Sequence, residues 1–195
     1  MNPVKHTFPE VLNKKGVINL PDKNKTALLV IDMLRDFVEK GAPLEVPKAR
    51  GIVANIRREI NKARRNNIPI IYSCDSHLKD DREFAIWPPH AVKGTLGAEV
   101  IDELKPREGD IVIRTGTYSG FFRTSLDKTL KELGVRRLIL TGVVTNICIL
   151  YTAVDAYMRG YEVSVPEDCV TALRAADHRF AMRQISETLK TFRSS

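Results

Sequence analysis

Short apolar runs alternate with longer stretches of helical periodicity along most of the chain. Continuous apolar runs, typical of strands buried on both faces, occur at 27–31, 68–72, 110–113, 137–140 and 161–165. Apolar residues recur every three or four positions over 47–66, 126–133, 153–157 and 180–189, which predicts helices. Alternating strands and helices predict βαβ units with right-handed crossovers, and therefore an α/β fold with a parallel sheet covered on both faces.

The chain of 195 residues is long enough for one α/β domain with its own core. We expect this domain over residues 26–195, preceded by a polar N-terminal arm over 1–25 that packs on the domain or on a neighbouring subunit. The first twenty residues hold no apolar block of signal-peptide length, and no run approaches the roughly 20 residues that span a bilayer. We therefore expect a cytoplasmic protein without a membrane partner.

The net charge of +7 raises the question of nucleic-acid binding. The basic residues are scattered, however, and no RNA- or DNA-binding motif accompanies the densest group, on the helix predicted over 47–66. We interpret the charge as a property of the solvated surface and expect no nucleic-acid partner. The three cysteines, Cys74, Cys148 and Cys169, are widely spaced, which is typical of free thiols rather than of a disulfide scaffold.

Candidate chemistry gathers directly after the predicted strands, where open parallel sheets bind ligands. Asp32 follows the first run, Asp75 and His77 the second, Arg114 and Thr115 the third, and Cys148 the fourth. Cys148 sits where a buried strand turns into a helix, and free amides and the helix dipole there stabilise a thiolate or an oxyanion. Asp32 is placed to take the thiol proton as general base. The alternative is a buried structural cysteine and an aspartate that caps a helix, and we interpret Cys74 and Cys169 as structural cysteines of this kind.

Asp75, His77 and His90 form a second candidate set. Asp75 and His77 are two residues apart, so both side chains point to one side of an extended segment. One carboxylate and two imidazoles are common ligands of Zn²⁺, Fe²⁺ or Mn²⁺. Spacing alone does not distinguish a metal site from a chance grouping of these three residues.

Five segments together resemble the isochorismatase-like cysteine hydrolases: VIDMLRDF, D-x-H, WPPHAVKGTLGAE, TYSGFFRTSL and LTGVVTNICILYTAVDAYMRGYEV. The resemblance covers residues 26 to about 172 and is most specific around Cys148. It implies a six-stranded Rossmann-like sheet, Cys148 as nucleophile and Asp32 as base. It also implies a cis peptide between Val144 and Thr145, which would aim the amides of Val144 and Cys148 at the oxyanion.

The Asp-x-His and Trp-Pro-x-His segments resemble the metal site of the nicotinamidase branch of this family. The resemblance implies a divalent metal on Asp75, His77 and His90, zinc or alternatively iron or manganese, that binds the ring nitrogen of the substrate. Phe37 and Trp87 match the aromatic residues that sandwich the ring, with core packing as the alternative, and Tyr118 is a further substrate-binding candidate. We therefore predict a nicotinamidase-type amidohydrolase that forms a thioester on Cys148 and uses no nucleotide cofactor. Because members of this family are usually oligomers, the resemblance also implies a homo-oligomer.

The sequence leaves other functions open. The protein could hydrolyse isochorismate or a small ureido or carbamoyl amide, or it could be a ligand-binding member of the family with impaired catalysis. The last arises because the family's catalytic lysine, three residues before the tyrosine of its motif, corresponds here to Thr115. Our hypothesis is that the neighbouring Arg114 replaces this lysine as the electrostatic partner of Asp32. In a strand, residues 114 and 115 face opposite sides, so only one can point into the site.

Overall fold

A computed structural model describes residues 25–189, so the expected N-terminal arm lies almost entirely outside the described residues. The core is a parallel sheet in the order β3-β2-β1-β4-β5, with β6 paired to the far end of β4. The strands are β1 (Thr26–Ile31), β2 (Ile70–Asp75), β3 (Ile111–Thr115), β4 (Arg137–Val143), β5 (Glu162–Ser164) and β6 (Val170–Thr171). The predicted α/β fold with a parallel sheet of five to six strands is confirmed.

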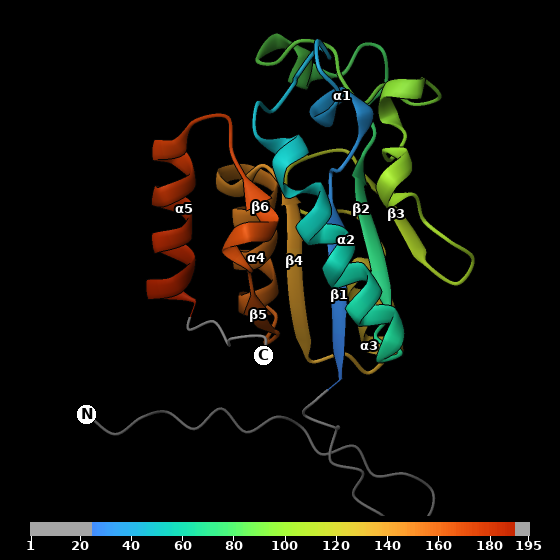
Figure 1. The fold of residues 1–195 in the computed structure, drawn as a ribbon, viewed down its shortest axis with the longest axis vertical. Coiled ribbons are helices and arrows are strands. Elements are labelled where there is room, and N and C mark those ends of the chain that lie inside the picture. Colours follow the sequence, from blue (N-terminus) through green and yellow to red (C-terminus); the bar gives the residue numbers. More distant parts are fainter. Residues whose placement is uncertain (1–24, 190–195) are drawn as a thin grey trace, which may run out of the picture.

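Helices cover both faces of this sheet (Figure 1). They are α1 (Arg35–Val38), α2 (Ala49–Arg65), α3 (Leu126–Glu132), α4 (Leu150–Met158) and α5 (Ala175–Thr188). Helix α2 lies on one face, where Ile52, Ile56 and Ile60 repeat every four residues and are buried, and its charged residues face outward. Helices α3, α4 and α5 contribute their apolar side chains to the core on the other face.

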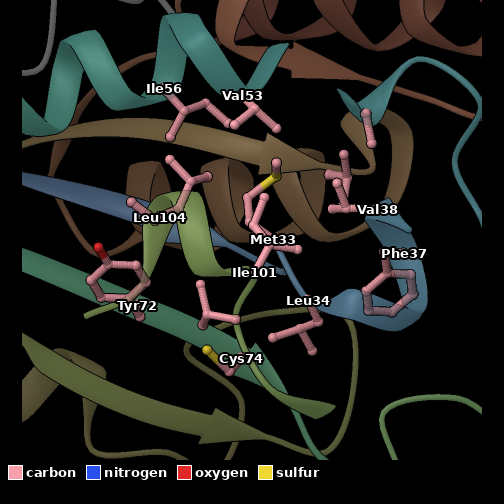
Figure 2. Packing of buried hydrophobic residues seen from close by; sticks show 14 of the residues in the cluster. Met33, Leu34, Phe37, Val38, Val53, Ile56, Tyr72, Cys74, Ile101 and Leu104 are labelled. Carbon is pink, nitrogen blue, oxygen red and sulfur yellow. The ribbon is translucent and has the colours of Figure 1, made fainter. Parts of the chain in front are cut away.

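The core on the α2 face extends to the end of the sheet that carries the strands' carboxyl ends. Figure 2 shows Val53 and Ile56 of α2 above Met33 and Leu104, with Phe37 at the edge of the same cluster. Met33, Leu34 and Phe37 follow β1 closely and are buried, so this packing fixes the segment that leaves the first strand. The residues just after β1 are therefore held rigidly over the sheet.

Several short turns complete the domain. Three 3₁₀ turns, η1 (Arg82–Ala85), η2 (Leu96–Ala98) and η3 (Asp102–Leu104), lie between β2 and β3, and η5 (Glu167–Cys169) precedes β6. A π-helical turn, η4 (Thr145–Ile149), joins β4 to α4. Within residues 25–189, no helix is both long enough and apolar enough to cross a membrane.

Candidate active site

Asp32 follows the last residue of β1, has a positive φ of 52° and is only 4% exposed. Its Oδ1 accepts a hydrogen bond of 2.8 Å from the backbone amide of Asp75, at the end of the neighbouring strand β2. On the other side, Gly142 of β4 pairs in register with Ile31. Gly142 has a φ of 116°, and a Cβ atom there would collide with the carbonyl oxygen of Ile31. Glycine thus lets β4 approach the backbone that carries Asp32.

Cys148 lies in the π turn η4, beyond the end of β4. The amides of Ile147 and Ile149 both donate to the carbonyl oxygen of Val144, at 3.1 and 3.2 Å, which closes this wide turn. Cys148 is partly buried, and its thiol lies close enough to the Asp32 carboxyl group for the two to interact electrostatically. The structure therefore brings the predicted nucleophile and the predicted base together, from two adjacent strands.

The cis peptide bond lies between Val143 and Val144. The predicted position, between Val144 and Thr145, is therefore wrong by one residue. Strand β4 continues through Val143, so the cis bond is the one by which the chain leaves the strand. Val144 and Thr145 both still lie close to the nucleophile in the chain: Val144 precedes the π turn and Thr145 is its first residue.

Burial and negative charge dominate the electrostatics of Asp32 and Cys148. Burial, and then the nearby Asp75 carboxylate, raise the pKa of Asp32 to about 8. Burial and the carboxylates of Asp32 and Asp75 raise the pKa of the Cys148 thiol well above its usual range, and a backbone hydrogen bond from Val144 opposes this effect. Additional positive charge beside this pair would therefore favour the thiolate.

Asp75, His77 and His90 converge next to Asp32, together with Glu83 from η1. One ligand atom of each of the four lies within 4.8 Å of the others. Oδ2 of Asp75 lies 2.8 Å from Nε2 of His77 and 3.4 Å from Nε2 of His90. Metal bonds of about 2.1 Å place neighbouring ligand atoms about 3.0 to 3.4 Å apart in octahedral or tetrahedral sites. The donor set therefore fits a divalent metal ion.

The surroundings of these side chains agree with a metal site. Oδ1 of Asp75 is buried without a hydrogen-bond partner among the described residues. Nδ1 of His90 lies 2.7 Å from the carbonyl oxygen of Pro88, to which it donates, so Nε2 is left to coordinate. Nδ1 of His77 lies 3.2 Å from Oδ2 of Asp81. Burial opposes protonation of His77, but the Asp75 carboxylate outweighs it and raises the pKa of His77 to about 9, so a metal ion would bind there in place of a proton.

A small pocket, partly open to solvent, connects the thiol with the candidate metal ligands. Phe37, Trp87 and Tyr118, the predicted substrate-binding residues, all line it. The indole nitrogen of Trp87 donates to the hydroxyl of Tyr118 at 3.4 Å. The Tyr118 ring stacks on the Tyr151 ring, with 5.8 Å between the ring centroids. The pocket thus has aromatic walls, with a thiol on one side and metal-binding groups on another.

Arg114 and Thr115 both lie within β3, which extends two residues beyond the apolar run. Arg114 pairs in register with Cys74, on the α2 face, and its guanidinium donates to the carbonyl oxygen of Ala98 at 3.0 Å. Its other nitrogen lies 3.8 Å from a Glu99 carboxylate oxygen. These contacts give no support to Arg114 as the partner of Asp32. Thr115 is buried and pairs in register with Asp75.

The other two cysteines are buried in the core, as predicted. Burial raises the pKa of each, Cys74 and Cys169, to about 12. Neither lines the pocket.

The sequence reasoning missed several residues of the site. Glu83 follows Asp80, Asp81 and Arg82 in a strongly charged stretch, so it looked like part of a solvated loop. Its only sequence signal was its position six residues after His77, between the candidate metal ligands His77 and His90. Leu44, Val46 and Leu173 add apolar walls to the pocket, and nothing in their local pattern marked them.

Comparisons with known proteins identify the family and the fold. The family model of the isochorismatase domain matches residues 26–194. A probable inactive nicotinamidase of Arabidopsis thaliana is 36% identical over 165 residues, which cover 78% of this chain and 84% of that protein. An uncharacterized isochorismatase family protein of Bacillus subtilis (strain 168) is 31% identical over 173 residues, with 86% and 92% covered.

Solved structures of three amidases share the fold. The nicotinamidase PncA of Bacillus subtilis superposes with a TM-score of 0.83 at 29% identity, covering 88% of this chain and all of that one (100%). An N-carbamoylsarcosine amidase of Thermoplasma acidophilum gives 0.80 at 38% identity, with 86% and 94% covered. The pyrazinamidase of Pyrococcus horikoshii, solved in complex with zinc, gives 0.80 at 32% identity, with 84% and 95% covered.

Proposed function

The chain belongs to the isochorismatase family, and we propose that it is a cysteine amidohydrolase that cleaves the C–N bond of a small, neutral aromatic amide. Nicotinamide, converted to nicotinic acid and ammonia, is the leading candidate. The observation that carries the proposal is a single pocket holding the neighbouring pair Cys148 and Asp32, aromatic walls, and a donor set that fits a divalent metal.

The reaction divides into two steps. The Cys148 sulfur attacks the carboxamide carbon while Asp32 takes the thiol proton and passes it to the departing nitrogen, so that ammonia leaves and a thioester remains. Asp32 then takes a proton from water, which attacks the thioester, and returns a proton to the sulfur as the acid leaves. The backbone amides around Val144 and Cys148 are the candidate donors to the oxyanion.

The same four side chains, Asp75, His77, Glu83 and His90, would hold the metal, which we propose to be zinc, or alternatively iron or manganese. When bound, it supplies a Lewis-acid contact for a ring nitrogen. Phe37 and Trp87 would sandwich the ring. The hydrogen bond from Trp87 to Tyr118 fixes these two aromatic side chains relative to each other.

The charge of the pocket argues for a neutral substrate. Its lining, taken from the described residues, contains three carboxyl groups and neither lysine nor arginine. Substrates with a carboxylate of their own, such as N-carbamoyl amino acids or isochorismate, would find no lysine or arginine to pair with among those lining residues. A neutral pyridine or pyrazine amide needs no such partner, and it leaves the positive charge of the proposed metal ion free for its ring nitrogen.

A second candidate is a ligand-binding member with impaired catalysis. It is favoured by one observation: Thr115, which cannot carry positive charge, stands where the family resemblance places a catalytic lysine. The name of the Arabidopsis relative, a probable inactive nicotinamidase, agrees with this second candidate.

An assay of ammonia release, with chromatography for isochorismate because it contains no nitrogen, separates these functions. The purified protein, supplied with Zn²⁺ or Mn²⁺, is incubated with nicotinamide, pyrazinamide, N-carbamoylsarcosine and isochorismate, with Cys148→Ala as the matched control. We expect turnover of the two neutral amides that disappears in Cys148→Ala. Turnover retained in Cys148→Ala would refute the cysteine mechanism, and binding of nicotinamide without any turnover would support the second candidate.

Assembly and location stay proposals. We propose a homo-oligomer in the cytoplasm, with neither nucleic acid nor membrane as partner. Sedimentation of the full chain gives the subunit number, and a monomer at micromolar concentration would contradict the proposed homo-oligomer.

A further inference from the structure

The turn that presents Cys148 is tied to the last helix by a side-chain contact outside the substrate pocket. Oγ1 of Thr145 lies 3.0 Å from Nδ1 of His178. Thr145 is the first residue of the π turn and is completely buried. His178 lies in the first turn of α5, which packs against the π turn and runs beside α4 (Figure 1).

The direction of this hydrogen bond follows from the other side of the imidazole. Nε2 of His178 lies 3.8 Å from a carboxylate oxygen of Glu167, in η5. A carboxylate on that side favours the tautomer with the proton on Nε2, which leaves Nδ1 as an acceptor. The Thr145 hydroxyl then donates to Nδ1.

The Thr145 side chain lies at the start of the π turn, whose backbone is closed by two hydrogen bonds. The hydrogen bonds from Ile147 and Ile149 share a single acceptor, the Val144 carbonyl oxygen. A hydroxyl at the first residue of a helical turn can also bond to nearby backbone groups, which would allow the turn other arrangements. The bond to His178 selects one side-chain conformation of Thr145, three residues before the nucleophile.

We propose that His178 is a positioning residue for the nucleophile: by accepting a hydrogen bond from the Thr145 hydroxyl, it fixes the π turn and thereby the direction of the Cys148 sulfur. This inference rests on the proposed cysteine mechanism. A displacement of the nucleophile by about 1 Å costs up to about 10²-fold in rate. The effect should therefore appear in bond formation to sulfur, while the affinity of the pocket for the ring stays the same.

Two ligands separate these quantities without turnover. Pyridine-3-carbaldehyde can form a thiohemiacetal: the sulfur bonds to the carbonyl carbon, the C=O π bond breaks, and the thiol proton ends on the carbonyl oxygen. Pyridine-3-methanol fills the same space and forms no bond to sulfur. We expect His178→Ala and Thr145→Val to weaken binding of the aldehyde about tenfold, and to change binding of the alcohol less than about twofold.

Conservative variants distinguish positioning from general support of the fold. His178→Asn keeps a polar atom near the position of Nδ1, and Thr145→Ser keeps the hydroxyl, so both should retain most of the aldehyde affinity.

In kinetics with the best amide, His178→Ala should lower kcat about tenfold and leave KM within about twofold. The double variant Thr145→Val/His178→Ala should lose no more than either single variant, because both remove the same hydrogen bond. Arg179→Ala, an exposed neighbour on α5, is the matched control and should behave as wild type.

Each result has a defined meaning. If the wild-type protein binds the aldehyde no better than the alcohol and shows no turnover, the proposed function fails and the inference with it. If wild type binds the aldehyde tightly but His178→Ala binds it equally well, or the two single losses add, only the inference is overturned. Loss of both ligands together with a lower Tm would assign His178 a structural role instead, and would also overturn it.

Discussion

The backbone amide of Asp75 donates a 2.8 Å hydrogen bond to Oδ1 of Asp32. This bond joins the proposed base, directly after β1, to a proposed metal ligand, at the end of β2. One carboxyl group thus has two tasks: it interacts with the Cys148 thiol and it orients the backbone of a metal ligand. These tasks can be separated by substitution.

Asp32→Asn keeps an oxygen that can accept from the Asp75 amide and loses the ability to take a proton. Asparagine also tolerates the positive φ of 52° found here. We expect kcat to fall about 10²- to 10⁴-fold with little change in metal affinity. Asp32→Ala should lose activity and also bind metal more weakly, because the Asp75 amide loses its acceptor. Competition with a chromophoric chelator gives the metal affinity; equal affinities in the two variants would contradict the second task.

Asp81 lies against two of the candidate metal ligands from outside the site. Its Oδ2 lies 3.2 Å from Nδ1 of His77, and its Oδ1 accepts from the amide of Glu83 at 2.9 Å. Carboxylates that hold metal-binding histidines this way contribute about 10- to 100-fold in metal affinity. We expect Asp81→Ala to weaken zinc binding by such a factor, measured by titration calorimetry of the metal-free protein. The exposed neighbour Asp80→Ala is the control, and an equal loss in both variants would point to general loop charge instead.

Gly142 and Gly51 provide a matched pair for stability. Gly142 has a φ of 116°, and a Cβ atom there would strike the Ile31 carbonyl, so Gly142→Ala should lower the free energy of unfolding by about 3 kcal/mol or more. Gly51 lies within α2, and a Cβ atom added there would meet nothing within 4 Å, so Gly51→Ala should raise the free energy of unfolding by about 0.5 to 1 kcal/mol. Urea denaturation measures both. A neutral Gly142→Ala would mean that β4 can move away from β1.

The fold was predictable because strands buried on both faces leave continuous apolar runs, as in 27–31 and 137–140. Strand β6 has only two residues, too few for a period, and the resemblance alone implied a sixth strand. Asp32, Asp75 and Cys148 were found by one rule, that chemistry follows the carboxyl ends of parallel strands.

The remaining site residues depend on tertiary contacts that local pattern does not encode. Glu83 joins the metal donors only because η1 brings it back beside Asp75, the last residue of β2, and the charged residues around it hid that position. The hypothesis for Arg114 depended on where β3 ends. Two extra strand residues put the Arg114 side chain on the α2 face, beside Ala98 and Glu99, and Thr115 next to Asp75.

That register leads to the sharpest functional prediction, at Thr115. This residue is buried at the end of β3 and lies opposite Asp75, so a lysine there would bring an ammonium group toward the carboxylates of Asp75 and Asp32. Burial and negative charge raise the pKa values of Asp32 and Cys148, and a nearby cation would oppose this effect and favour the ionised base and the thiolate.

We therefore expect Thr115→Lys to raise kcat for nicotinamide about tenfold or more, while Thr115→Met, of similar length without charge, should not. Arg114→Ala should change kcat less than about twofold, because its guanidinium is engaged with Ala98 and Glu99. Steady-state ammonia release measures all three, with thermal unfolding as a check that each variant folds. A folded Thr115→Lys no faster than wild type would mean that this chain does not need the family's lysine, whereas a large loss in Arg114→Ala would restore Arg114 as its replacement.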